Sequence, residues 1–115
     1  MRCNVEIDFD NDSLEKDCND LSRLVKRHNV KRAKLIRRRL DDLRAARSLD
    51  VMRALPGRCH ELLGDRALQL SLDLDGPYRL ILRPRHNPVP VKADGGLDWT
   101  KVTELTVVEV VDTHD

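Results

Sequence analysis

Four ionisable residues of this chain are of types that take part in acid–base and phosphate chemistry. Asp112 and His114 follow the hydrophobic run Val107 to Val111, so a carboxylate and an imidazole lie at the end of an expected strand. Farther back, His60 supplies a second imidazole and Arg79 a permanently charged guanidinium. Their chemistry depends on whether the fold brings them together.

Two imidazoles, a carboxylate and a guanidinium could cleave RNA without a metal, because the ribose 2′-hydroxyl can act as the nucleophile. The reaction needs a base for the hydroxyl proton, an acid for the leaving 5′-oxygen and cations beside the phosphate. Histidine titrates near pH ~6.5, so His60 and His114 could supply both proton transfers, in either assignment. Taken singly, each histidine is more often a surface or capping residue. Arg79 would hold the phosphate through its planar set of donors, and Asp112 would orient an imidazole or contact the substrate.

The chain is long enough for a single domain spanning residues 1–115. It has 115 residues, of which 40% are hydrophobic, and a chain of this size buries roughly two thirds of its unfolded surface. No apolar run approaches the ~20 residues of a membrane span, and the N-terminus lacks a signal-peptide pattern. We therefore expect a cytoplasmic protein without membrane association.

The three cysteines do not form a recognisable framework; they are Cys3, Cys18 and Cys59. Their odd number and their spacing favour reduced, partly buried thiols over disulfides or a zinc site. A metal site made of His60, Asp112 and His114 is a weaker alternative, because no two of these residues share a helical turn. We expect neither a metal nor another cofactor.

Charge is distributed unevenly, although the net charge is only +1. The first twenty residues hold seven acids and two cations, whereas residues 23–47 hold eleven of the 21 Lys and Arg. This basic block would attract phosphate backbones or an acidic protein surface, and a solvated helix face is an equally weighted alternative. The candidate RNA-binding residues are Lys31, Arg32, Lys34, Arg37, Arg38 and Arg39, together with Arg66, for which a turn residue paired with an acid is equally plausible.

The N-terminal half has the pattern of one strand and two helices. Residues 2–9 alternate between apolar and polar, which predicts a half-buried strand. Asp12 and Glu15 resemble a capping box that opens a helix. After a short break at His28-Asn29, a longer helix is expected to run to Pro56-Gly57, with an apolar seam made of Ala33, Ile36, Leu40 and Leu43. Two such helices should pair antiparallel and cover a sheet.

After Pro56 the apolar period changes from about 3.6 to 2. Residues 68–74 alternate between leucine and polar residues, which predicts a strand with one solvated face. A turn at Asp75-Gly76-Pro77 leads to a return strand from Tyr78, and the last strand is expected over about residues 102–111. Trp99 is interpreted as the anchor of the loop 84–98 on the sheet. The order of strand, two helices and three or four antiparallel strands predicts an α+β layer fold.

Several ordered motifs from Leu55 onward resemble one family of proteins. They are Leu55-Pro56-Gly57, His60-Glu61-Leu62, Gly64-Asp65-Arg66, Ser71-Leu72-Asp73-Leu74, Pro77-Tyr78-Arg79-Leu80-Ile81, Asn87-Pro88-Val89-Pro90, Asp94-Gly95-Gly96-Leu97-Asp98-Trp99 and Asp112-Thr113-His114. In these residues the chain resembles the HigB-type plasmid-maintenance killer proteins of the RelE/ParE toxin superfamily. The resemblance covers about residues 30–114, and the residues before them match only in helix layout.

The resemblance implies a compact antiparallel sheet backed by two N-terminal helices. It also implies the toxin of a type II toxin–antitoxin system: a growth-inhibiting, metal-independent endoribonuclease, or mRNA interferase, that acts on ribosome-bound mRNA. The implied partners are the ribosome, mRNA and a small helix-turn-helix antitoxin encoded beside the toxin, which binds it in a hetero-oligomer. By position, His60, Arg79, Asp112 and His114 fall where the family places active-site residues.

The chain departs from the family pattern at two positions. Leu63 stands where the family has a lysine, and Thr113 stands where the family has a tyrosine. Loss of one electrostatic contact to a transition state can lower a rate ~100-fold, and loss of one stacked base is worth ~1–3 kcal/mol. Two functions therefore stay open: an active endoribonuclease, or a catalytically impaired toxin-like module that binds an antitoxin and takes part in operon regulation.

Overall fold

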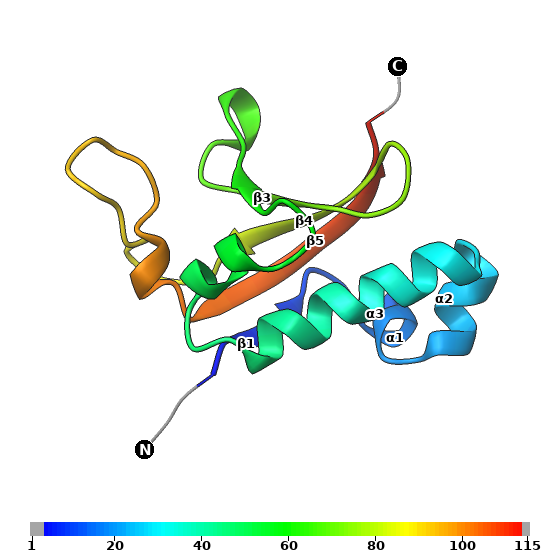
Figure 1. Cartoon of the computed structure of the whole chain (residues 1–115). Helices are drawn as coiled ribbons and strands as arrows, with labels where there is room; N and C mark the ends of the chain where they lie inside the picture. Colours follow the sequence, from blue (N-terminus) through cyan, green and yellow to red (C-terminus); the bar gives the residue numbers. More distant parts are fainter. Residues whose placement is uncertain (1–3, 114–115) are drawn as a thin grey trace.

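The computed structural model describes residues 4–113, which form an α+β fold with helices on one face of a five-stranded sheet (Figure 1). The strands are β1 (Glu6–Phe9), β2 (His60–Glu61), β3 (Leu70–Asp73), β4 (Tyr78–Pro84) and β5 (Glu104–Asp112). The α-helices are α1 (Asp12–Cys18), α2 (Leu21–Arg27) and α3 (Val30–Ala45). The 3-10 helices are η1 (Leu49–Ala54), η2 (Gly64–Arg66) and η3 (Trp99–Lys101).

The sheet is mixed, which corrects the expectation of an antiparallel sheet. Its strand order is β1-β5-β4-β3-β2, with β1 parallel to β5 and the other neighbouring pairs antiparallel. Alternation in residues 2–9 predicted a strand, and Glu6–Phe9 forms it. A period of two carries no information about the direction of pairing. β1 forms one edge of the sheet, beside the last strand β5. The three helices then carry the chain to the opposite edge, where β2 lies.

The first expected helix is in fact two short helices. The Asp20 carboxylate accepts the backbone N–H of Ser22 at 3.0 Å, and this cap opens α2 within what looked like one continuous apolar pattern. α1 is capped by Asn11, whose side-chain oxygen accepts the Leu14 N–H at 2.8 Å, and not by Asp12. The predicted helix is therefore divided in two, because Asp20 caps the free N–H groups at the start of α2.

The long helix α3 ends at Ala45, well before the predicted end at Pro56-Gly57. Ala46 takes an extended conformation, and its carbonyl accepts the Val5 N–H at 2.8 Å. This contact ties the end of α3 to the chain entering β1. The 3-10 helix η1 takes up the residues between α3 and Pro56.

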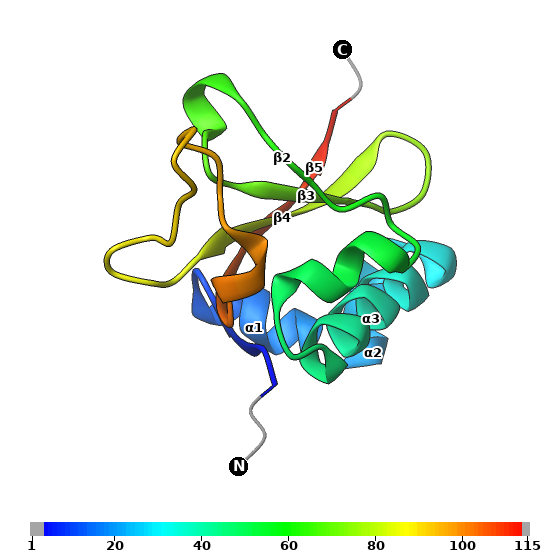
Figure 2. The ribbon, with the colours of Figure 1, turned by 60° about the vertical axis from the view of Figure 1, so that its left-hand side comes forward.

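The core lies between α3 and the sheet (Figures 1 and 2). The predicted seam of α3 is confirmed, since Ala33, Ile36, Leu40 and Leu43 are each 0% exposed. Facing it are buried residues of the three central strands: Leu70, Leu72, Leu80, Leu82, Leu105 and Val107. Because side chains alternate along a strand, the residues between these leucines point to the opposite face of the sheet.

The turn before β2 is packed tightly against β3. Gly57 and Arg58 both have positive φ, at 113° and 47°. The Gly57 carbonyl accepts the Asp73 N–H at 2.7 Å, and the Asp73 carbonyl accepts Arg39 Nε at 3.0 Å. α3, the turn and β3 are therefore joined at one point.

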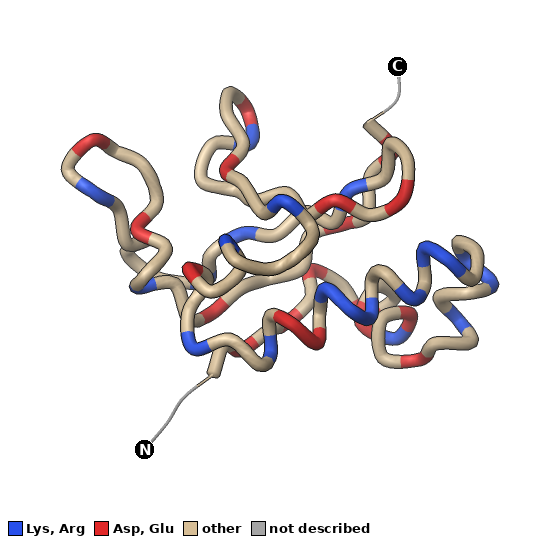
Figure 3. Tube along the Cα trace, in the orientation of Figure 1, with Lys and Arg blue, Asp and Glu red and all other residues tan. Residues whose placement is uncertain are grey.

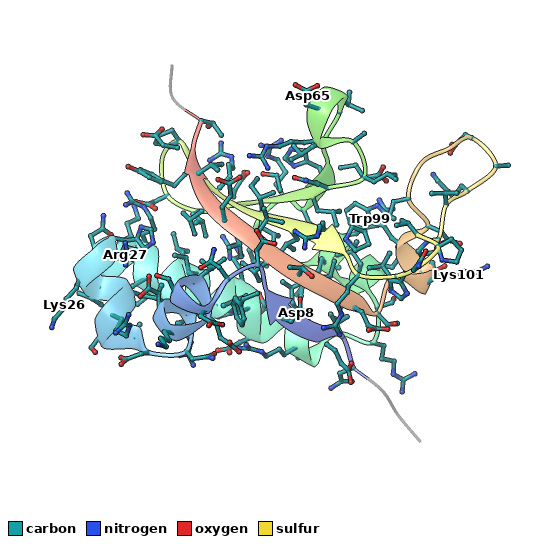
Figure 4. All side chains as sticks on the ribbon, turned by 180° about the vertical axis from the view of Figure 1, so that it is seen from behind. Asp8, Lys26, Arg27, Asp65, Trp99 and Lys101 are labelled. Carbon is teal, nitrogen blue, oxygen red and sulfur yellow. The ribbon has the colours of Figure 1, made fainter. Side chains whose placement is uncertain are left out.

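Trp99 anchors the loop 84–98, as predicted. Its side chain is 4% exposed, and its Nε1 donates to Glu61 Oε1 of β2 at 2.9 Å. The Arg53 guanidinium of η1 lies 4.0 Å from the centre of the ring. In Figure 4, Trp99 lies between β4 and the base of this loop.

Among residues 4–113, none of the helices has both the length and the apolar character needed to cross a lipid bilayer.

We predict that Gly57→Ala destabilises the protein more than Gly95→Ala, as measured by urea unfolding. Both glycines have positive φ, so each alanine should cost about 1 kcal/mol of backbone strain. A Cβ at Gly57 would lie 2.7 Å from Arg39 Nε, whereas nothing lies within 4 Å at Gly95. The crowding should cost Gly57→Ala about 1–3 kcal/mol more. Equal losses would show that this junction relaxes freely.

Candidate functional site

The face of the sheet opposite α3, called the polar face below, carries His60 and Arg79, two of the three catalytic candidates that the structure describes. It is made of the side chains that alternate with the core leucines: His60, Ser71, Asp73, Arg79, Ile81, Arg83, Thr106 and Glu109. In the strand register, His60 pairs with Ser71, Ser71 with Ile81, and Ile81 with Glu109. These four residues form one row across the sheet. Arg79 lies opposite Asp73 in the next row. His60 and Arg79 therefore share a face.

His60 and Arg79 are not in contact. Their Cα positions are two strands and two residues apart, which is about 10 Å across the sheet and about 7 Å along it. Two residues between them make the connection. The Arg58 carbonyl binds His60, and the Asp73 carboxylate binds the guanidinium groups of both Arg58 and Arg79.

Sequence reasoning missed Arg58 and Asp73 as site residues. Asp73 belongs to the motif Ser71-Leu72-Asp73-Leu74 and to the solvated side of its strand, but neither pattern gave it a role in the site. Arg58 lies outside the helices and strands, in a segment whose sequence has no periodic apolar pattern. Its nearness to His60 in the sequence was the available signal, but only the turn at Gly57 directs its guanidinium to β3.

The hydrogen bond of His60 fixes the tautomer of its ring. Nδ1 lies 2.8 Å from the Arg58 carbonyl oxygen, and a carbonyl can only accept, so Nδ1 carries the proton. The neutral ring then has its lone pair on Nε2. An imidazole held in this way can accept a proton at Nε2 from a substrate hydroxyl.

Arg79 is held by three partners. Its Nε lies 3.0 Å from Asp73 Oδ1, and its Nη1 donates to the carbonyls of Gly76 at 2.9 Å and Tyr78 at 2.8 Å. Its side chain is only 21% exposed. The guanidinium is thus oriented before any ligand arrives.

Asp112 lies at the end of β5, opposite Tyr78 in register. Since Arg79 is the next residue of β4, alternation turns Asp112 toward the opposite side of the sheet from Arg79. His114 lies outside the described residues. Thr113 is fixed to the β3–β4 turn, because its N–H and hydroxyl both donate to the Pro77 carbonyl, at 2.9 Å and 2.7 Å.

The loop between β2 and β3 carries the two remaining positions of interest on this side. Leu63 is 88% exposed, so its side chain has almost no packing role. Arg66 donates to Glu109 Oε2 at 2.6 Å and to Gln69 Oε1 at 2.9 Å. Arg66 thus bridges the polar face from η2 to β5. Figure 2 shows this loop on the side of the sheet away from α3.

The basic residues of α3 divide into two groups. Figure 3 shows basic residues concentrated on α2 and the N-terminal half of α3. Arg39 is buried and binds the Asp73 carbonyl, and Arg32 binds both carboxylate oxygens of Asp75, at 2.9 and 3.0 Å. These two arginines hold the fold together. The exposed members are Lys31, Lys34 and Arg38, while Arg37 is half-buried and its Nε is buried without a partner among the described residues.

Ion pairs also cover the β1 end of the polar face. Arg83 binds Asp10 at 3.0 Å, and Arg85 binds Asp8 at 2.7 Å. Asp8 also accepts the Thr106 hydroxyl at 2.6 Å, and it lies on β1 beside β5 (Figure 4). Burial acts to raise the pKa of Asp8, but hydrogen bonds from Thr106 and Arg85 and the charges of the two arginines lower it.

Cys18 and Cys59 are free thiols. Burial raises the pKa of Cys18 to about 11 and that of Cys59 to about 12. Neither is therefore a reactive thiolate at neutral pH. Within residues 4–113, no group of three or more His, Cys, Asp or Glu is arranged to hold a metal ion.

Two of the clefts among the described residues lie on the helices. One of about 390 Å³ is lined by Asp17, Arg23, Lys26 and Arg27. Another of about 320 Å³ is lined by residues of α2 and α3: Leu21, Lys34, Arg37, Arg38 and Asp41. Neither of these two clefts is lined by His60 or Arg79.

Comparisons of the chain with known protein families, curated proteins and solved structures found no match.

We predict that Arg32→Lys lowers stability by about 1–3 kcal/mol at neutral pH, whereas Arg38→Lys changes it by less than about 0.5 kcal/mol. Arg32 and Asp75 are 12% and 14% exposed, and the Arg32 guanidinium also stacks 3.4 Å above the Tyr78 ring. Arg38 is 66% exposed in its pair with Asp42, so its guanidinium is largely solvated. Lysine keeps the charge but loses the paired donors and the stacking.

The effect of Arg32→Lys should shrink as the pH falls. Burial acts to raise the pKa of Asp75, but the hydrogen bonds and charge of Arg32 outweigh it and leave this pKa below its ordinary value. A lowered folded-state pKa contributes stability above the unfolded value of about 3.9, and this is lost as pH falls through the folded value. Urea unfolding at neutral pH and near pH ~2 measures the difference. An undiminished difference at low pH would assign the effect to the Tyr78 contact alone.

Proposed function

We propose that this chain is a RelE/ParE-type toxin that cleaves ribosome-bound mRNA on its polar face. The observation that carries the proposal is that His60 and Arg79 share this face and are connected through Arg58 and Asp73. One residue presents Nε2 of its imidazole away from the Arg58 carbonyl, and the other presents an oriented cation. The resemblance of about residues 30–114 to killer proteins gives the expected substrate and its location on the ribosome.

In the proposed reaction, the ribose 2′-oxygen attacks the adjacent phosphorus and the bond to the 5′-oxygen breaks. His60 Nε2 can take the 2′-hydroxyl proton, and Arg79 compensates the charge that develops on the phosphate. In this assignment the second proton, for the leaving 5′-oxygen, comes from His114, which the resemblance places among the active-site residues. The expected products are a 2′,3′-cyclic phosphate and a 5′-hydroxyl end.

The expected partners follow from the same resemblance. A small helix-turn-helix antitoxin encoded beside this chain would silence it in a hetero-oligomer. The exposed cations Lys31, Lys34 and Arg38 of α3 are suited to contact ribosomal RNA, since they remain available to solvent. Arg32 and Arg39 would contribute only indirectly, by holding in place the helix that carries Lys31, Lys34 and Arg38.

A second candidate function is a catalytically impaired module that binds the antitoxin and takes part in operon regulation. Two observations favour it. The exposed Leu63 offers no charge at the position where the family has a lysine. In addition, the arginines of the polar face are already bound to carboxylates of the chain itself.

We predict that His60→Asn lowers cleavage by about 100-fold or more, because a positioned base contributes that much to proton transfer. The Asn amide can still donate to the Arg58 carbonyl, so the turn should stay in place. His28→Asn changes a histidine outside the polar face and serves as the matched control. Mapping of mRNA 5′ ends after induction, with growth curves, gives the measurement. Wild-type cleavage by His60→Asn would remove His60 from the mechanism.

We predict that Leu63→Lys combined with Thr113→Tyr raises cleavage at least about tenfold, because it restores a cation and a stacking ring. The exposed Leu63 can be replaced without loss of packing, and the backbone bond of residue 113 to Pro77 remains. Leu63→Gln combined with Thr113→Tyr is the control without the charge. If the restored variant and wild type cleave equally, these two departures do not weaken the enzyme, and the impaired module loses its main support.

A further inference from the structure

We infer that Arg58 and Arg79 form a two-armed clamp for one RNA phosphate, with Asp73 as the positioning residue that sets their spacing. The inference rests on the proposed function for its ligand, RNA. It adds a binding residue, Arg58, that no sequence motif identified. It also gives Asp73 a role that differs from that of the other carboxylates on the polar face.

One carboxylate holds both arms of the clamp. Arg58 Nε lies 2.9 Å from Asp73 Oδ2, and Arg58 Nη2 lies 3.2 Å from Oδ1. Arg79 Nε lies 3.0 Å from the same Oδ1. Two guanidinium groups from separate segments are thus brought beside each other, although their like charges repel.

The charge count leaves room for one anion. Arg58 and Arg79 contribute two positive charges and Asp73 one negative charge, so one positive charge stays uncompensated. A phosphodiester carries a single negative charge and accepts hydrogen bonds from guanidinium groups in a planar, paired geometry. One backbone phosphate would therefore balance this cluster, in keeping with the RNA ligand of the proposed function.

Both arms keep donors for such a ligand. Arg58 is 64% exposed and binds Asp73 through Nε and Nη2, so its Nη1 is directed away from this bond. Arg79 uses Nε and Nη1 on Asp73 and on two backbone carbonyls. Its Nη2 has no hydrogen bond to another described residue. These Nη groups are the proposed contacts to phosphate oxygens.

The backbone on both sides of the clamp is fixed. Arg58 is a non-glycine residue at φ 47°, and the Gly57 carbonyl beside it accepts the Asp73 N–H at 2.7 Å. The Asp73 carbonyl in turn accepts Arg39 Nε from α3 at 3.0 Å. The arms therefore start from positions set by the fold, which lowers the entropy lost when a ligand binds.

Charge balance separates this cluster from the other arginines of the polar face. Arg66 with Glu109 and Arg83 with Asp10 are balanced one to one. Arg85 is surrounded by three carboxylates, at 3.6 Å for Glu6, 2.7 Å for Asp8 and 3.0 Å for Glu104. Within the described residues of this face, Arg58 and Arg79 thus have the excess of positive charge. They also lie closest in the hydrogen-bond network to His60.

A double-mutant cycle tests the clamp, with a fluorescein-labelled single-stranded RNA decamer as the probe in anisotropy titrations. Arg58→Gln and Arg79→Gln should each weaken binding about tenfold, as expected for loss of a charged hydrogen bond. The double variant should bind little more weakly than either single one, because one arm alone cannot hold the phosphate. The control cycle of Arg58→Gln with Arg85→Gln should be additive.

Asp73→Asn tests the positioning role with two readouts that move in opposite directions. Removal of the negative charge should tighten RNA binding severalfold and steepen its salt dependence. Cleavage should fall by ~10–100-fold, because the two guanidinium groups are no longer held in register. A purely structural role would lower binding, cleavage and melting temperature together, and that result would overturn the role of Asp73.

The outcomes separate the clamp from the proposed function. Coupled losses for Arg58 and Arg79 without any mRNA cleavage by the wild type would support the clamp and refute the nuclease. Cleavage by the wild type with additive losses would leave the nuclease in place and overturn the clamp. Absence of RNA binding by the wild type overturns the clamp as well.

Discussion

The structure depends on the burial of the α3 seam against the leucines of β3 and β4. Each fully buried leucine contributes about 1.5–3 kcal/mol, and Leu40, Leu72, Leu80 and Leu82 are all 0% exposed. A shift of one residue in strand register would turn these leucines to the opposite face. The register is therefore fixed, and with it the set of side chains that forms the polar face.

The polar face is built from charged groups that already have partners. An exposed ion pair contributes about 0–1 kcal/mol, so these pairs add little to stability individually. Their larger effect is to orient guanidinium groups along the strands. An RNA backbone that binds this face must compete with the carboxylates of β1, β3 and β5 for the arginines. The position at which a phosphate would bind then depends on where positive charge is in excess, and among the described arginines of this face that is at Arg58 and Arg79.

The acidic N-terminal residues take part in this arrangement. Asp8 and Asp10 lie on or just after β1 and bind Arg85 and Arg83 on the neighbouring part of the sheet. These acids of the N-terminal segment are therefore neutralised by arginines at the β1 edge of the sheet. The exposed basic residues of α3, which are Lys31, Lys34 and Arg38, lie on the other side of the sheet. The molecule thus presents two surfaces of different electrostatic character.

The sequence by itself determined the α+β class, the α3 seam, the strand alternation and the anchoring role of Trp99, because these follow from local periodicity and burial. It also gave His60 and Arg79 as candidates, and the strand register places both on the polar face. It did not determine that β1 is parallel to β5, that Asp20 divides the first helix or that α3 ends at Ala45. Nor did it give the connection through Arg58 and Asp73. These features depend on contacts between segments distant in sequence, such as the bonds of Ala46 to Val5 and of Gly57 to Asp73, and only the tertiary structure brings those atoms together.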